Sequence, residues 1–220
     1  MNASVDTDII IHLYSSKHES LLYNFFDNLY IYEYLVETEL RKVSSKVYSK
    51  FLSDVNSKNV SIVTDIDLVK KGMKPIFDRY VSENEILFDQ GELYAIALAK
   101  TLGLPTLLTD DTKEFGPHRM LVKELIEEVF PLTFYELLFL EFITGRITVN
   151  KLHSKFELIN KVSMQNPMSF RSKILKTVKR FSYTFGTDRD FEWINNYCKV
   201  CKIDYAVEVY KLEEYLRSNL

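Results

Sequence analysis

The feature that most constrains the fold is the alternation of β-forming and helical segments along residues 1–133. Runs rich in β-branched, aromatic and other apolar residues occur at 29–35, 59–64, 105–111 and 129–133, and an extended start covers 2–6. The segments between them show the apolar patterns of helices, and among the helices that we expect are 18–28, 37–55 and 114–128. Because strands that alternate with helices form parallel sheets covered on both faces, we predict an α/β domain with a central parallel sheet.

From residue 134 onward, helical patterns follow one another without a convincing strand. The expected helices cover 134–146, 149–162, 169–183 and 189–218. We therefore predict an α/β domain over 1–133 and an all-helical extension over 134–220 that packs on it. Cys198 and Cys201 fall within the last expected helix, and no second cysteine pair supplies the four ligands of a structural zinc site. We expect two free thiols.

The composition excludes several large enzyme classes. Only 6 glycines occur, none at the spacing of phosphate-binding G-x-G-x-x-G or G-x-x-x-x-G-K-[ST] loops, and G-x-S-x-G and H-E-x-x-H are missing. The net charge is −3, so binding of nucleic acid would need a local basic patch or metal ions. The first residues carry two acids and do not resemble a signal peptide, and no apolar run is long enough to cross a bilayer, so we expect a cytoplasmic protein.

Acidic residues stand where predicted strands end and helices begin. They are Asp6, Asp8, Glu39, Glu92, Asp110 and Asp111. Because sites in open α/β sheets form at the carboxyl ends of the strands, we expect these side chains to share one rim of the sheet. Crowded carboxylates repel one another unless a cation neutralises them, and Mg²⁺ or Mn²⁺ suits such oxygen donors. An ion held there can activate water against a phosphodiester.

Each acid also has a structural interpretation. Asp89 and Glu92 form the D-x-x-E pattern of a helix capping box. Asp6 or Asp8 could cap the helix that follows, and Glu39 could be an exposed charge on an amphipathic helix. The acid pair that ends the third β-forming run could close a turn. Only their joint position at one end of the sheet favours a functional site.

Three segments carry a resemblance to a known family. They are VDTDIIIHL at 5–13, ETELRKV at 37–43 and GELYAIALAKTLGLPTLLTDD at 91–111. Together they resemble the PIN-domain ribonucleases, and among these the VapC-type toxins, over about residues 1–133. The resemblance implies a three-layer α/β/α sandwich and Mg²⁺- or Mn²⁺-dependent hydrolysis of RNA. It also implies, as in many members of the family, the toxin of a toxin–antitoxin pair.

The resemblance also implies roles for individual residues. Asp6, Glu39, Glu92 and Asp111 match the family's catalytic metal ligands, Asp110 and Asp8 are further candidate ligands, and Thr109 could orient a ligand. The expected partners are RNA, an antitoxin protein and a second copy of the chain in a homodimer. The chain departs from the common family pattern in Asp8, in the glutamate at the third acidic position and in the long helical extension.

A basic stretch in the extension has two interpretations. Residues 158–187 contain no Asp or Glu but carry Lys173, Lys176 and Arg180. An apolar stripe runs through the same helix, formed by Phe170, Ile174, Val178 and Phe181. The stretch is either a basic helix docked through this stripe or a patch that contacts RNA phosphates.

Two alternative functions come from other classes. In a haloacid-dehalogenase-like phosphatase, Asp6 of the D-T-D motif would be the nucleophile, Asp8 the acid–base group, and the Asp110–Asp111 pair a Mg²⁺ ligand. In a non-catalytic PIN-like scaffold, the helical extension would bind a partner protein. The metal-dependent ribonuclease remains the first prediction because the phosphatase leaves Glu39 and Glu92 without a role.

Overall fold

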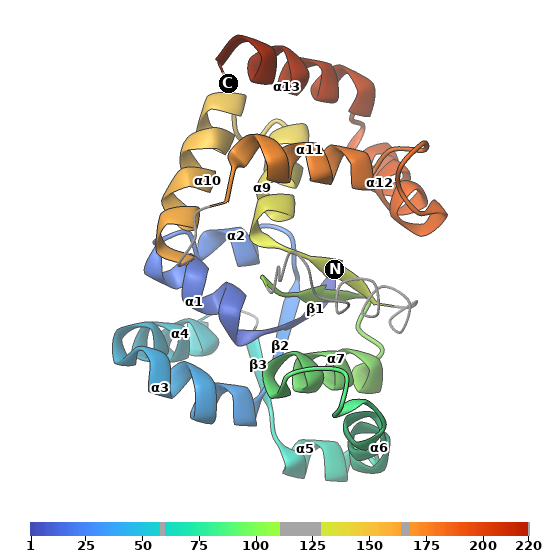
Figure 1. Cartoon of the computed structure of the whole chain (residues 1–220). Helices are drawn as coiled ribbons and strands as arrows, with labels where there is room; N and C mark the ends of the chain where they lie inside the picture. Colours follow the sequence, from blue (N-terminus) through green and yellow to red (C-terminus); the bar gives the residue numbers. More distant parts are fainter. Residues whose placement is uncertain (58–59, 111–128, 164–167, 220) are drawn as a thin grey trace. The chain divides into compact units, whose positions relative to one another are not determined.

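The computed structural model describes residues 1–57, 60–110, 129–163 and 168–219 (Figure 1). The chain divides into two compact units, Met1–Phe134 and Tyr135–Leu220.

The first unit is built on a parallel sheet of five strands in the order β3-β2-β1-β4-β5. The strands are β1 (Asn2–Val5), β2 (Asn28–Tyr32), β3 (Val60–Val63), β4 (Thr106–Leu108) and β5 (Phe130–Leu132). In the centre of the sheet, Ser4 of β1 is paired with Tyr30 of β2 on one side and Leu107 of β4 on the other. The predicted central parallel sheet is confirmed.

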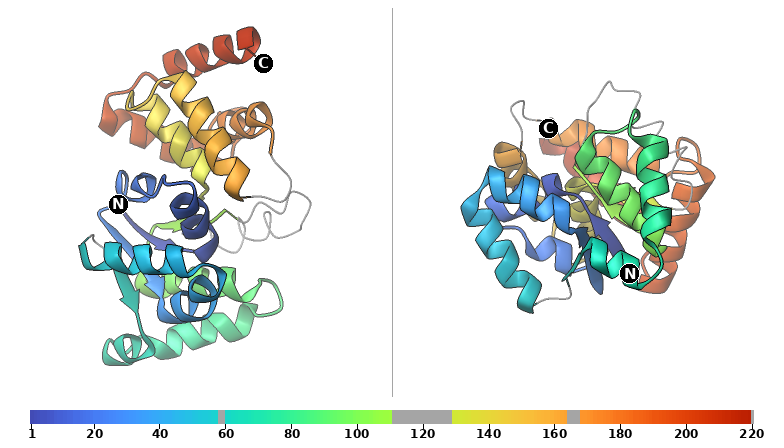
Figure 2. Two further views of the ribbon diagram at one scale, coloured as in Figure 1. Left: turned by 90° about the vertical axis from the view of Figure 1, so that its left-hand side faces the viewer. Right: turned by 90° about the horizontal axis from the view of Figure 1, so that it is seen from below.

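Helices cover both faces of this sheet, as predicted. The connections from β1 to β2 to β3 contain α1 (Thr7–Ser15), α2 (Ser20–Tyr23), the π-helix η1 (Leu35–Leu40), α3 (Arg41–Val43) and α4 (Ser45–Ser57). The return from β3 to β4 contains α5 (Asp65–Lys70), α6 (Lys74–Asn84) and α7 (Gln90–Leu102). Because right-handed crossovers that run in opposite directions fall on opposite faces, the two groups enclose the strands, as Figures 1 and 2 show.

Helix α7 is apolar and packs on the sheet. It packs against β1, β2 and β4. The hydroxyl of Ser4 donates a 2.8 Å hydrogen bond to the carbonyl of Ala95, which ties the helix closely to β1. Asp89 caps the start of α7, where its Oδ1 accepts the backbone N–H of Glu92 at 3.1 Å. Gly103 ends the helix at φ 62°, a left-handed conformation that glycine adopts without strain.

Three sequence expectations in this unit were wrong in their boundaries. The strand expected over 29–35 ends at Tyr32, and the single helix expected over 37–55 is divided at Ser44, whose backbone is extended. Ser44 accepts the backbone N–H of Val47 at 3.2 Å and so starts a new helix as a cap. The helix expected over 18–28 is limited to α2. The helix expected over 114–128 lies outside the described residues.

The second unit is helical throughout its described residues. Its helices are α9 (Phe134–Ile143, whose first residue belongs to the first unit), α10 (Val149–Ser163), α11 (Phe170–Arg180), α12 (Asp188–Cys201) and α13 (Tyr205–Asn219). The last two were expected as one helix, but Lys202 adopts a left-handed conformation between them, at φ 56°. Both cysteines are free thiols, Cys198 buried and Cys201 exposed. None of the helices in the described part of the chain has the length and apolar character of a membrane span.

The interpretation of Lys173, Lys176 and Arg180 as one RNA-binding patch was wrong. Lys173 is 1% exposed and its ammonium group lies 5.6 Å from the centre of the Tyr135 ring. Arg180 is 7% exposed and forms ion pairs with Glu136 at 2.8 Å and Asp190 at 3.0 Å.

Lys176 alone of the three is exposed. The reason is the helical spacing, which places residues 173 and 180 on the same buried face of α11 as the apolar stripe.

Candidate active site

The candidate site lies where the order of the strands reverses. Asp6 directly follows β1, and Thr109 directly follows its neighbour β4. The backbone N–H of Asp6 donates to the carbonyl of Leu108 at 2.9 Å, so the two strand ends stay joined at this point. In parallel sheets, the strands on either side of such a reversal separate their connections and leave a crevice at their carboxyl ends.

Asp6 is held in one orientation by its neighbours. Its Oδ1 accepts the backbone N–H of Thr7 at 2.6 Å, and its Oδ2 accepts the hydroxyl of Thr109 at 2.9 Å. Thr109 therefore orients this acid, in line with its expected role. Asp6 is only 3% exposed. Its burial and the negative charge of Asp8 raise its pKa from 3.8 to about 8, although the two hydrogen bonds oppose the change.

Glu39 approaches Asp6 from η1. Its carboxylate accepts the hydroxyl of Thr7, the same residue that donates its backbone N–H to Asp6. Partial burial raises the pKa of Glu39, and the charges of Asp8 and Asp89 act in the same direction against the Thr7 hydrogen bond. Two acids from separate elements are thus held by one threonine.

Gly91 makes the space for these two acids. A Cβ atom built on Gly91 would lie 3.1 Å from each carboxylate oxygen of Glu39 and 3.5 Å from Oδ1 of Asp6. The missing side chain therefore allows the first turn of α7 to approach the acids closely. Sequence reasoning used this glycine only as part of a family pattern and missed its steric role.

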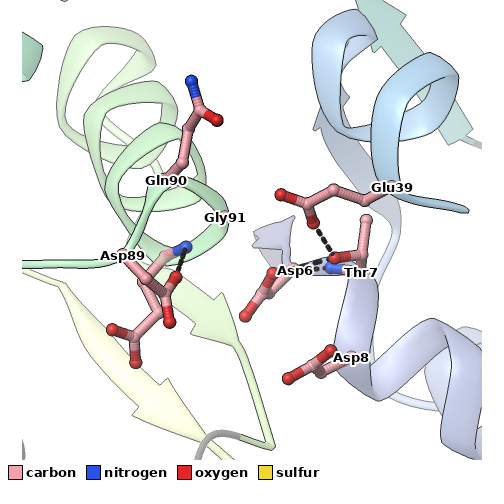
Figure 3. Close-up of a pocket in the computed structure, with 8 residues that line it drawn as sticks. Asp6, Thr7, Asp8, Glu39, Asp89, Gln90 and Gly91 are labelled. Atoms are coloured by element: carbon pink, nitrogen blue, oxygen red, sulfur yellow. Dashed lines mark hydrogen bonds between the residues drawn. The ribbon is translucent and has the colours of Figure 1, made fainter.

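Most of the predicted acids line one pocket. Its volume is about 250 Å³, and its lining residues are Asp6, Thr7, Asp8, Glu39, Asp89, Gln90, Gly91 and Glu92. Figure 3 shows Asp6, Asp8 and Glu39 on one side of the pocket, facing the start of α7 with Asp89 and Gln90 on the other. The predicted convergence of Asp6, Asp8, Glu39 and Glu92 on one rim is confirmed. Asp89, expected only as a helix cap, is an additional acid of the pocket.

Asp110 does not line this pocket, in contrast to its prediction as a ligand. It is 3% exposed, and its two oxygens are used elsewhere. Oδ1 accepts the backbone N–H of Phe134 at 2.8 Å, and Oδ2 lies 2.8 Å from Nδ1 of His12. Asp110 therefore connects the end of β4 to α1 and to the start of α9. Asp111, the fourth predicted ligand, lies outside the described residues.

His12 is the partner of Asp110, and this contact was not predicted from the sequence. Burial alone would lower the pKa of His12, but the hydrogen bond and charge of Asp110, together with Asp8 and Asp6, raise it above 6.5. Its position four residues after Asp8 on α1 was the available sequence signal, because residues at that spacing share a helix face.

The donor set of the pocket fits a hard divalent cation. All its charged groups are carboxylates, which are the ligands that Mg²⁺ and Mn²⁺ prefer, and burial together with the charge of Asp8 raises the pKa of Asp6 among them. As they stand, no three acid, histidine or cysteine side chains of the described residues are gathered tightly enough to hold an ion. One carboxylate oxygen of Glu39 already accepts the hydroxyl of Thr7.

Comparisons of the chain with known protein families, with curated proteins and with solved structures found no match.

Proposed function

We propose that the chain is a metal-dependent endoribonuclease that hydrolyses RNA phosphodiester bonds at the acidic pocket. The observation that carries this proposal is the convergence of acids from β1, η1 and the start of α7 on one crevice of a parallel sheet. Such a cluster suits a reaction in which negative charge develops on phosphate oxygens, because a cation held by the acids offsets that charge.

Asp6, Glu39 and Glu92 would hold the ion, with Asp111 as the fourth ligand carried over from the family resemblance. A bound Mg²⁺ or Mn²⁺ would lower the pKa of a water molecule and neutralise charge on the phosphate. The protein groups around it have supporting tasks. Thr109 fixes the orientation of Asp6, and Gly91 keeps the first turn of α7 out of the space that the ligands need.

The direct test is RNA cleavage by the full chain with Mn²⁺, compared with the same reaction in chelator and with the Asp6→Asn variant. We expect cleavage to require the metal and to be lost in the variant. Glu83→Gln is the matched control, because it also removes one negative charge but changes an exposed side chain of α6 that pairs with Arg79. Equal RNA cleavage under all these conditions would remove the assignment.

The same proteins separate the alternatives. A haloacid-dehalogenase-like phosphatase would release phosphate from p-nitrophenyl phosphate, whereas a phosphodiester nuclease would not. A non-catalytic scaffold need not bind Mn²⁺, and calorimetric titration of the wild type and of Asp6→Asn measures this property without an activity assay. We expect Mn²⁺ binding by the wild type that is weakened in the variant.

A further inference from the structure

Two tyrosines are joined to the wall of the acidic pocket through Gln90. The hydroxyl of Tyr34 donates to Oε1 of Gln90 at 3.0 Å, and Nε2 of Gln90 donates to the hydroxyl of Tyr94 at 3.2 Å. Gln90 itself lines the pocket, one residue from Gly91. The aromatic pair therefore contacts one residue of the pocket lining.

The pair is backed by the hydrophobic core. The rings of Tyr34 and Tyr94 are 5.0 Å apart at 74°, and Tyr94 also packs on Phe77 and Tyr32. Phe77 and Tyr32 are buried, whereas Tyr34 and Tyr94 are partly exposed. Tyr34 thus forms the outer end of a packed aromatic cluster, and a ligand meeting it would meet a surface with little side-chain freedom to lose.

The chemistry of this surface matches a nucleobase. An aromatic ring stacks on any base, and a glutamine amide both donates and accepts hydrogen bonds along a base edge. A phosphate placed at the carboxylates through a cation would carry its ribose and base directly to the neighbouring wall of the pocket.

We propose that Tyr34, Gln90 and Tyr94 form a subsite for one unpaired nucleobase next to the phosphate that is cleaved. This inference rests on the proposed function for the position of the phosphate. A paired base cannot occupy the subsite, because stacking on Tyr34 requires one face of the base to leave its neighbours. We therefore expect the subsite to bind strands that carry a base more tightly than abasic strands of equal charge.

The test measures binding and not cleavage. The full-length wild-type chain is titrated in Ca²⁺, a hard cation that also binds carboxylate oxygens, with a fluorescent oligouridine and with an abasic oligoribonucleotide of the same length, and electrophoresis checks that the strands stay intact. We expect tighter binding of the base-bearing strand, and we expect Tyr34→Leu to weaken that binding about tenfold while leaving the abasic strand unchanged. Tyr34→Phe should retain most of the preference because it keeps the ring.

Tyr80→Leu is the matched control, since Tyr80 is a partly exposed tyrosine of the same unit that lines a different pocket. It should leave both affinities unchanged. Equal binding of the two strands by the parent chain, or an equal loss for both strands in Tyr34→Leu, overturns the subsite. A thermal melt of each variant identifies loss of folding, and Gln90→Ala, which changes an exposed side chain, then provides the second variant.

The two proposals fail differently. If the wild type shows metal-dependent RNA cleavage while base and abasic strands bind alike, the nuclease stands and the subsite is wrong. If base preference depends on Tyr34 but no RNA is cut with Mn²⁺, the subsite stands as a binding site and the nuclease assignment is wrong.

Discussion

Replacing Gly91 with alanine should separate the stability of α7 from the chemistry of the acidic pocket. Gly91 is the second residue of α7, and the added methyl group would lie 3.1 Å from both carboxylate oxygens of Glu39. That distance is shorter than ordinary van der Waals contact, so the acid must retreat by a few tenths of an ångström. Its hydrogen bond to Thr7 would have to adjust with it.

The substitution has two opposing effects on the free energy of unfolding, a gain in helix propensity and the strain of the new contact. Alanine is favoured over glycine by about 1 kcal/mol in a helix interior, and this gain offsets the strain of the contact. We therefore expect the free energy of unfolding to change by less than about 1 kcal/mol. We expect a larger effect on catalysis than on stability, because misplacement of a catalytic group by about 1 Å lowers the rate on the order of a hundredfold. We expect Mn²⁺ affinity and RNA cleavage to fall about tenfold or more.

Urea unfolding, Mn²⁺ calorimetry and RNA cleavage measure these effects on one protein preparation. Gly103→Ala is the control with the reverse behaviour. Its φ of 62° strains alanine, yet no described atom lies within 4 Å of the added Cβ, so it should cost about 1 kcal/mol and spare metal binding. If Gly91→Ala binds Mn²⁺ and cleaves RNA as the wild type does, the close approach of α7 to Glu39 has no functional role.

Three further substitutions or modifications test the rest of the molecule. Arg180→Met should lower the free energy of urea unfolding by about 3–5 kcal/mol, because two buried carboxylates lose their cation, and a cost below about 1 kcal/mol would contradict this. Asp110→Asn should destabilise the chain by about 1–3 kcal/mol and leave Mn²⁺ affinity intact, whereas a metal defect without destabilisation would make Asp110 a ligand. Burial and Cys201 raise the pKa of Cys198 from 9.0 to about 11, so the stability that the neutral Cys198 thiol contributes below pH 9 is lost as the pH rises through 11. In native protein at pH 8, iodoacetamide should therefore modify Cys201 well before Cys198, and equal rates would refute the burial.

The fold class could be predicted because periodicity and burial have the same cause. Strands that are buried on both faces read as apolar runs, and the helices between them show one apolar stripe. The division of the long predicted helix at Ser44 could not be read in this way, because the apolar spacing continues across it. The deciding interaction is the hydrogen bond that the Ser44 side chain accepts from the backbone of Val47. The adjacent serine in the sequence made the position of this cap ambiguous.

The acids illustrate how far the sheet rule reaches. It placed Asp6 and Glu39 at one rim because that follows from strand direction alone. It could not distinguish Asp110 from a pocket residue, because the direction of a side chain after a strand end depends on its hydrogen-bond partners. Those partners, His12 and the backbone of Phe134, are remote in sequence.

The basic stretch shows a second kind of limit. A run of lysine and arginine is by default a solvated face, and its charge gives no sign of burial. Arg180 is buried because Glu136 and Asp190 meet it in the folded unit, and Glu136 is 44 residues away. Only knowledge of the packed helices identifies such a pair, since each partner alone looks like an ordinary surface charge.

A role as a helix cap alone does not explain why residue 6 is an acid. Its carboxylate accepts hydrogen bonds from the backbone of Thr7 and from Thr109, and caps α1. Asparagine or serine serves as a helix cap equally well and carries no charge. A buried carboxylate with a pKa raised to about 8 works against folding at neutral pH, and the nearby Asp8 and Glu39 increase the cost. A divalent cation bound by these acids would offset that cost, and for this reason we propose a metal site rather than a set of helix caps.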